Sequence, residues 1–254
     1  MADIVYMIVR RAMAAQPKDN QEGRALIALR ERILGGVLPG GTRLFEVPLA
    51  EEMRISRTPL RAAMSRLAEE GLLERARGGG FLVRAFTVAD VIDAIELRGV
   101  LEGTAARLAA ERGVPEERLA RLAVLTAELD GCFQGATVDF ERYSALNGAF
   151  HAALQHLPGS EILARELERT KTLPFASPSA FLPDETAHAD FERSLAHAQA
   201  QHRALHEAIA AREGARAEAI AREHARLARR NLDHLIRNKA PGAPLSPALA
   251  LVID

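Results

Sequence analysis

Apolar residues recur at helical spacing from Glu22 onward. The spacing predicts a helix that the glycines and proline of 35–41 bring to an end. A short helix over 48–53 follows, then a tight turn at 54–55, and then a third helix that Ser56 caps and Gly71 ends. The apolar face of the first helix consists of Ala25, Leu26, Leu29, Ile33 and Leu34, and that of the third consists of Leu60, Met64 and Leu67.

The pattern becomes strand-like directly after Gly71. Residues 72–76 and 81–84 predict two short strands, and the glycine-rich stretch 77–80 between them predicts the tip of a β-hairpin. This is the only strong β signal in the sequence. Three helices followed by a hairpin are the layout of a winged helix-turn-helix. In that layout the third helix fits the major groove of DNA, and the hairpin, or wing, touches the adjacent backbone or minor groove.

Everything after Phe86 is patterned as helix. Thr87 and Asp90 form a capping-box pattern at the start of the first of these helices. We therefore expect a mainly α protein, with an N-terminal winged helix-turn-helix and a C-terminal antiparallel bundle of six to seven helices. The expected helices are 87–112, 115–132, 138–156, 159–173, 190–212 and 215–238, with a proline-rich loop over 174–184. The expected domains are a flexible arm (1–20), a DNA-binding domain (21–85), an all-helical effector domain (87–239) and a tail (240–254).

Composition limits the class of protein. Of the 254 residues 48% are hydrophobic, yet no apolar run approaches the roughly 20 residues that cross a bilayer. The single cysteine, Cys132, excludes an internal disulfide framework and a multi-cysteine zinc site. We expect a cytoplasmic protein without a membrane partner. The net charge is only −1, but residues 21–84 carry 11 arginines against 8 glutamates, which suits a DNA-binding face.

Three polar residues mark the start of the third helix as a DNA contact. Arg57, Thr58 and Arg61 lie in or near its first turn. Free N–H groups and the helix dipole attract phosphate there, and an arginine can bind a guanine edge through two parallel hydrogen bonds. Arg30 and Arg66 are weaker candidates, for which phosphate contact and plain surface are equally good interpretations.

The same segment resembles the GntR family of regulators. Residues 49–64, LAEEMRISRTPLRAAM, continued by Leu67 and by EGLL at 70–73, follow that family's helix-turn-helix signature, and 26–44 follow its first helix and turn. The resemblance implies that Arg57, Thr58 and Arg61 meet bases or phosphates. It also implies that Gly78 at the wing tip approaches the minor groove, with Arg77 matching a basic residue that some relatives carry. Val47 stands where one member has an arginine, so that contact is not transferred.

The helical half carries polar side chains on faces that should be apolar. Arg98 and Glu102 lie in the stripe of the helix 87–112, where burial is costly unless each is paired or binds a ligand. A histidine falls in the apolar stripe of each of three later helices. One such histidine is usually a core residue, but three on separate helices suit convergence on a divalent metal, and imidazole favours zinc or nickel. These histidines are His151, with Asn147 one turn before it, His202, and His224, with Asn231 further along.

These helices resemble the effector domain of the FadR subfamily of GntR regulators, the FCD domain. The resemblance rests on residues 90–109, on FHAAL at 150–154, on 202–209 and on REH at 222–224. It implies that Asn147, His151, His202 and His224 match the aspartate and three histidines that hold a metal in some relatives. Asn147 brings no charge, which lowers the expected affinity or the number of ligands. Arg98 matches a position that meets an effector's carboxylate, and Glu102, His206 and Asn231 are further candidates for that pocket.

The sequence thus predicts a DNA-binding transcriptional repressor, not an enzyme. We expect a homodimer on a near-palindromic double-stranded operator, controlled by a small carboxylate at a zinc or nickel site. A metal-dependent hydrolase is the enzyme alternative, but no HExxH motif, nucleophile elbow or phosphate loop is present. A ligand-independent DNA-packaging protein is the other alternative, and it would not need three histidines in apolar stripes. The insert 173–181 is interpreted as a connecting loop rather than as a cover for the pocket.

Overall fold

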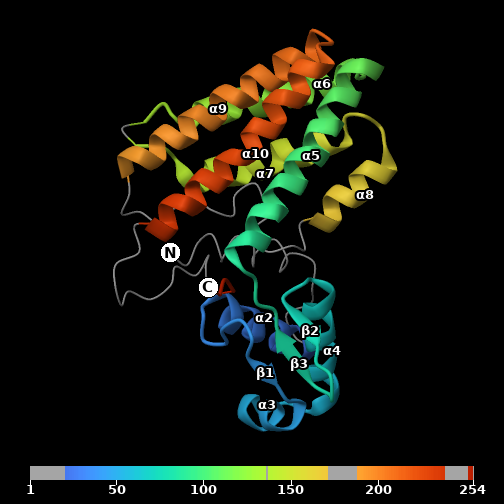
Figure 1. Ribbon diagram of the computed structural model, residues 1–254, viewed down its shortest axis with the longest axis vertical. Coiled ribbons are helices and arrows are strands. Elements are labelled where there is room, and N and C mark those ends of the chain that lie inside the picture. The colour runs from blue at the N-terminus through green and yellow to red at the C-terminus, as the bar shows by residue number, and fades with distance from the viewer. Residues whose placement is uncertain (1–20, 136, 171–187, 238–250, 254) are drawn as a thin grey trace. The chain divides into compact units, whose positions relative to one another are not determined.

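The computed structural model describes residues 21–135, 137–170, 188–237 and 251–253. Of these residues, 21–91 and 251–253 form one compact unit, and 92–170 and 188–237 form a second. Most of the residues in both units are helical (Figure 1). The predicted arm 1–20, the loop 174–184 and the insert 173–181 lie outside the described residues.

The first unit has three helices and a small antiparallel sheet. The strand order is β1-β3-β2, with β3 in the centre. The hairpin was predicted, but β1 was not, because a strand of two residues is too short to show an alternating pattern. Leu82 of β3 lies opposite Arg43 on one side and Glu74 on the other. The elements are α2 (Gln21–Leu34), β1 (Arg43–Leu44), α3 (Glu46–Met53), α4 (Arg57–Glu69), β2 (Leu73–Arg75) and β3 (Phe81–Val83).

The predicted apolar faces form the core of this unit. Helices α2 and α4 pack against each other, and α4 also packs against α3 and β2. Burying large aliphatic side chains of this kind contributes roughly 1.5–3 kcal/mol each to the free energy of unfolding. The largest fully buried side chains of the unit are Leu29, Ile33, Leu60, Met64, Leu67, Leu73 and Phe81.

Two residues with positive φ shape the turn between α3 and α4 and the tip of the β-hairpin. Arg54, in the turn between α3 and α4, has a left-handed backbone with φ 54° and ψ 44°. Its N–H bonds back to the carbonyls of Ala50 and Glu51, which closes α3 and turns the chain toward α4. At the wing tip Gly80 has φ +78°, and a Cβ there would lie 2.6 Å from the carbonyl oxygen of Leu44. Only glycine fits that position.

The end of the chain pairs with the segment that leads into α5. Phe86 donates to the carbonyl of Leu251 (2.9 Å) and accepts from the amide of Ile253 (2.8 Å), as a parallel bridge to Val252. Leu251 is buried. These residues were predicted to belong to a tail, because three residues carry no pattern of their own; the structure places 251–253 in the first unit.

The second unit consists of six helices within the described residues. The predicted capping box forms, since the amide of Thr87 donates to Asp90 Oδ2 (2.8 Å) and the amide of Asp90 donates to Thr87 Oγ1 (3.1 Å). Helices α6, α7, α9 and α10 pack around a common core, and α8 packs on α5 (Figure 1). The helices are α5 (Val88–Arg112), α6 (Glu116–Gly131), α7 (Phe140–His156), α8 (Glu161–Thr170), α9 (His188–Ala210) and α10 (Gly214–Arg237).

The core of the second unit is aromatic and aliphatic, and it encloses the polar residues that stood out in the sequence. Tyr143 and Phe150 of α7 are fully buried beside Leu205 of α9.

None of the helices in the described ranges combines the length with the apolar character that crossing a membrane requires.

Candidate metal centre and nucleic-acid interface

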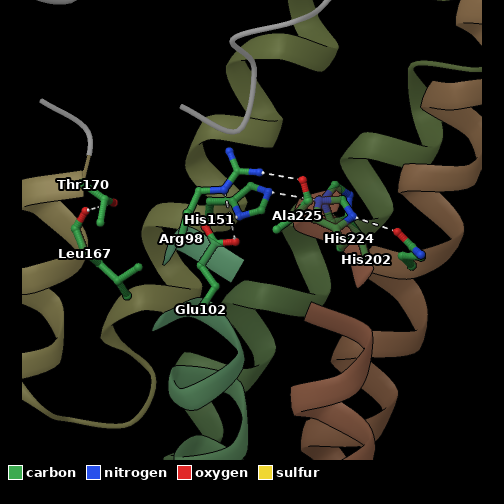
Figure 2. Close-up of polar contacts among 9 residues, drawn as sticks. Arg98, Glu102, His151, Leu167, Thr170, His202, His224 and Ala225 are labelled. Carbon is green, nitrogen blue, oxygen red and sulfur yellow. Dashed lines mark hydrogen bonds and ion pairs between the residues drawn. The ribbon is translucent and has the colours of Figure 1, made fainter. Parts of the chain in front are cut away.

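Three buried histidines from three helices converge inside the second unit (Figure 2). His151 comes from α7, His202 from α9 and His224 from α10. The Nε2 atom of His224 lies 3.1 Å from that of His202 and 3.3 Å from that of His151. One possible ligand atom from each ring falls within 4.8 Å of the others. The helices bring together the three positions that the sequence singled out.

The outer nitrogen of each ring faces an oxygen. His151 Nδ1 lies 2.9 Å from Glu102 Oε1, and His202 Nδ1 lies 3.1 Å from Gln199 Oε1. The amide of Gln199 is oriented by its own donors, because its Nε2 donates to the carbonyl of Thr126 and to Asp130 Oδ1. His224 Nδ1 lies 3.2 Å from Gln201 Oε1.

These contacts assign the tautomers of the rings. Carboxylate and amide oxygens accept hydrogen bonds, so each Nδ1 carries the hydrogen and each Nε2 presents a lone pair. The lone pair of His224 Nε2 then faces those of His202 (3.1 Å) and His151 (3.3 Å), which is repulsive. A proton satisfies one of these two contacts at a time, whereas a divalent cation can bind all three nitrogens. The three nitrogens therefore fit a metal ion. The oxygens of Glu102, Gln199 and Gln201 would orient the rings, as hydrogen-bond acceptors usually do for metal-bound histidines.

Burial keeps two of the three rings neutral. Removal from water lowers the pKa of His202 and His224 well below the ordinary value, and the neighbouring histidines lower it further. Neutral imidazole is the form that binds a metal. Burial alone would raise the pKa of Glu102, but His151 and Arg98 more than offset this and bring it to about 2. Glu102 is therefore an anion beside the histidine cluster.

Arg98 and Glu102 pair with each other along α5. Arg98 Nε lies 3.9 Å from Glu102 Oε2, and Arg98 Nη2 donates to the carbonyl of Ala225 (3.4 Å). Figure 2 shows both side chains directed toward His151. Glu102 was predicted to contact the effector, and this stays a prediction. In the structure its carboxylate contacts the ring of His151 across the interface between α5 and α7.

A small cavity adjoins the cluster. It has an accessible volume of about 30 Å³, and its wall includes Arg98, Asn147, His224 and Asn231. A space of this size holds about two water molecules. Asn231 accepts a hydrogen bond from Ser194 Oγ (3.0 Å). As far as its lining residues are described, the wall includes neither Glu102 nor His206, and His206 is half-buried on α9.

The predicted DNA contacts lie together at the start of α4. Arg57, Thr58 and Arg61 are all exposed. Glu46, the first residue of α3, bridges the two arginines. It accepts from Arg61 Nε (2.8 Å) and Nη2 (2.5 Å), and it lies 3.9 Å from Arg57 Nη2. Glu46 was not predicted as part of this site, because one glutamate at the start of a helix is an ordinary feature of helix ends.

The wing tip is held by an arginine that the sequence analysis also missed. Arg43 Nη2 donates to the carbonyls of Arg77 (3.1 Å) and Gly79 (2.9 Å). Arg77 and Gly78 are exposed, and Gly78 has φ +86°. Its register opposite Leu82 places Arg43 beside the hairpin, which a linear pattern does not indicate.

The assignment of Arg30 to a phosphate contact is not supported. Its side chain is 5% exposed, and its Nη2 lies 2.5 Å from Glu70 Oε2. It forms a partly buried ion pair that ties α2 to the end of α4, because the face of α2 that carries Arg30 turns toward the core. Arg66 remains exposed on α4, where it pairs with Glu69 and Glu70.

Comparison with known proteins agrees with this architecture. Residues 23–83 match the family described as "Bacterial regulatory proteins, gntR family", and residues 93–227 match the FCD domain. Among curated relatives, the Nta operon transcriptional regulator of Aminobacter aminovorans is 35% identical over 49% of this chain and 58% of its own length. The Glc operon transcriptional activator of Escherichia coli K12 is 25% identical over 84% of this chain and 92% of its own. The chain thus spans less than two thirds of the Nta regulator.

Solved structures share the fold. The Listeria monocytogenes structure titled "Lar controls the expression of the Listeria monocytogenes agr system and mediates virulence" superposes with a TM-score of 0.63. It is 18% identical and covers 85% of this chain and 99% of its own. E. coli McbR/YncC superposes with a TM-score of 0.55 at 22% identity, covering 86% and 98% of the two chains.

The matched families and curated relatives are transcriptional regulators and not enzymes, which removes the hydrolase alternative. The FCD match alone covers more than half of the chain, and the GntR match covers the winged helix-turn-helix. This protein belongs to the GntR family of bacterial transcriptional regulators, in the FadR subfamily whose second domain is the FCD domain.

Proposed function

We propose that this protein is a transcriptional repressor that binds a near-palindromic operator as a homodimer and responds to a small carboxylate at a divalent metal. The observation that carries the proposal is the convergence of three Nε2 lone pairs beside a cavity walled by Arg98. We place its action in the cytoplasm, where a bacterial regulator meets DNA.

The metal is held by His151, His202 and His224, with the amide oxygen of Asn147 as a fourth ligand. Imidazole ligands favour zinc, with nickel as the alternative. When bound, the metal supplies open coordination positions that an anionic oxygen can occupy. The remaining residues select the ligand: Arg98 presents a buried guanidinium at the cavity wall, which suits a carboxylate.

The size of the cavity bears on how the effector enters. An accessible volume of about 30 Å³ is far below the several hundred Å³ of a usual small-molecule site. A carboxylate effector must therefore widen the cavity. The lining residues Ser194 and Asn231 lie on α9 and α10, so binding separates or shifts those helices.

The DNA-binding half uses α4 and the wing. A single recognition helix covers too few base pairs for useful specificity, and a symmetric dimer on a near-palindrome doubles the number. Arg57, Thr58 and Arg61 contact bases and phosphates in the major groove, with Arg66 as a further phosphate contact. Arg77 and Gly78 approach the minor groove.

The test starts from selection of an operator out of random double-stranded DNA with the full-length protein. R57A and R61A are each expected to weaken binding to that operator by about 5- to 150-fold, because a lost bidentate contact costs about 1–3 kcal/mol. Their zinc content is expected to stay at about one ion per chain by elemental analysis. H151A/H224A is expected to lose the metal and retain operator binding.

The effector part is tested with a panel of sugar acids, hydroxy acids and aromatic acids at saturating zinc. At least one acid is expected to release wild-type protein from the operator without being consumed, and to leave H151A/H224A bound. Absence of metal after soaking in zinc and then nickel would exclude the metal site. A monomer on the operator in sedimentation would exclude the homodimer.

A further inference from the structure

We propose that Glu46 is a positioning residue for DNA recognition, which fixes the guanidinium of Arg61 and draws in Arg57 before DNA binds. This contact is expected to raise the ratio of the affinity for the operator to the affinity for non-specific DNA. The inference rests on the proposed function of α4 as the recognition helix.

The hydrogen bonds to Glu46 leave the outer edge of the Arg61 guanidinium, which can bind a base, without a contact to Glu46. Glu46 takes the Nε–Nη2 edge of the guanidinium, with one oxygen on each nitrogen. The edge formed by Nη1 and Nη2 is not used by Glu46, and it is a fork that can meet two acceptors of one guanine. Arg61 is still 57% exposed, so the held side chain presents that fork outward.

Glu46 is largely buried and Arg61 is largely exposed, so a side chain that is held in place can orient one that faces the solvent. The side chain of Glu46 is only 17% exposed, whereas that of Arg61 is largely exposed. A long arginine free in solvent loses rotamer freedom when it binds a base. The contact with Glu46 removes part of that freedom in advance, which lowers the entropic cost of binding.

The charge of Glu46 acts in the opposite direction on non-specific DNA. A carboxylate beside Arg57 and Arg61 offsets part of their attraction for phosphates, which supplies most non-specific affinity. The hydrogen bond from Arg61 lowers the pKa of Glu46, so the carboxylate stays charged at neutral pH. Glu46 therefore favours the specific contact between Arg61 and a base, and it weakens the binding of both arginines to the phosphates of non-specific DNA.

A purely structural role is the competing explanation. Glu46 is the first residue of α3, where the negative charge of any acidic residue stabilises the helix by interacting with the helix dipole. That role needs the charge at the start of the helix but no contact with Arg61. An aspartate at this position keeps the charge and is one methylene too short to reach the same guanidinium edge.

The experiment measures dissociation constants of the full-length protein for the selected operator and for a scrambled duplex, at several salt concentrations. E46Q is expected to weaken operator binding by about tenfold and to tighten scrambled binding by about threefold. E46D is expected to weaken operator binding similarly while scrambled binding stays at the wild-type value. E69Q is the matched control, because Glu69 is an exposed residue of α4 that pairs with Arg66 and makes no contact with Arg57 or Arg61 in the described part of the chain.

The control is expected to change both affinities by the same small factor, and melting temperatures verify that each variant folds. In an R61A background, E46Q is expected to leave the ratio of affinities unchanged. An unchanged ratio in both E46Q and E46D overturns the inference, and so does an equal loss of both affinities with a lower melting temperature. A wild-type protein without operator preference, or R61A without effect, instead overturns the proposed function of α4.

Discussion

Asn147 is the residue at which the candidate metal centre departs from the ligand set that its family resemblance implies. It is buried on α7, one turn before His151, and shares the cavity wall with His224. An amide oxygen can coordinate a divalent ion, but it brings no negative charge to offset that of the ion. Burial lowers the pKa of His202 and His224 well below the ordinary value, and the amide of Asn147 adds no charge, so Glu102 behind His151 is the carboxylate beside the candidate ligands.

Replacing this amide with a carboxylate is expected to tighten metal binding. N147D should lower the dissociation constant for zinc by about tenfold, or about 1.4 kcal/mol, in competition with a chromophoric chelator. N231D is the control, because it adds the same charge to the wall of the same cavity from α10. Equal tightening in both variants would mean that the charge acts at a distance and that Asn147 is not a ligand.

Single residues also mark the limit of what the sequence predicts. The three histidines stand out because each interrupts an apolar stripe, and helical periodicity places such a residue in the core. Gln199, Gln201 and Glu46 do not stand out, since polar residues on a helix are common and their partners lie on other elements. Periodicity places Arg30 on the same face of α2 as Leu26 and Ile33, but it does not indicate the ion pair with Glu70, which is 40 positions away.

At the scale of elements, the turn between α3 and α4 stores strain. Arg54 adopts a left-handed backbone with φ 54°, which disfavours any side chain with a Cβ by about 1–2 kcal/mol. The conformation persists because its N–H bonds and the packing of the two helices determine it together.

This strain predicts the order of stability of two variants. R54G is expected to be more stable than R54A by about 1 kcal/mol in urea unfolding, because both lose the same side chain and only glycine tolerates the backbone. The same pair of substitutions at Arg66, within α4, is expected to show the reverse order by a similar amount. Equal stability of R54G and R54A would mean that the turn relaxes to an ordinary conformation.

Elements with strong local signals were predicted well, and weak ones were not. The structure has all nine helices that the pattern indicated within the described residues, and the Thr87–Asp90 box forms as expected. Ser56 begins α4 as predicted, but its side chain makes no capping hydrogen bond. Strand β1 and the pairing of Phe86 with Val252 depend on partners distant in sequence, which local patterns do not contain.

At the scale of the whole molecule, the candidate DNA contacts and the candidate metal ligands belong to different units. All candidate DNA contacts belong to the first unit, and all three histidines belong to the second. A metal that binds only the folded second unit stabilises that unit by mass action, while the first unit gains nothing directly.

Calorimetry of the full-length protein with and without zinc tests this separation. Zinc at about 100 times its dissociation constant adds about 2.7 kcal/mol, which is expected to raise one unfolding transition by about 5–11 °C. A second transition is expected to stay in place, and H151A/H224A is expected to show no shift. A shift of every transition by the same amount would mean that the two units unfold as one.

The pairing of Phe86 with residues 251–253 provides a hydrogen-exchange reporter within the first unit, directly before α5. The amide hydrogen of Ile253 is held by the carbonyl of Phe86, directly before the residue that caps α5. It exchanges with solvent deuterium only when this short segment lifts away, so its exchange rate measures how often the segment detaches. Recording that rate with and without zinc would show whether the proposed metal site in the second unit affects the backbone next to α5, without any label or substitution.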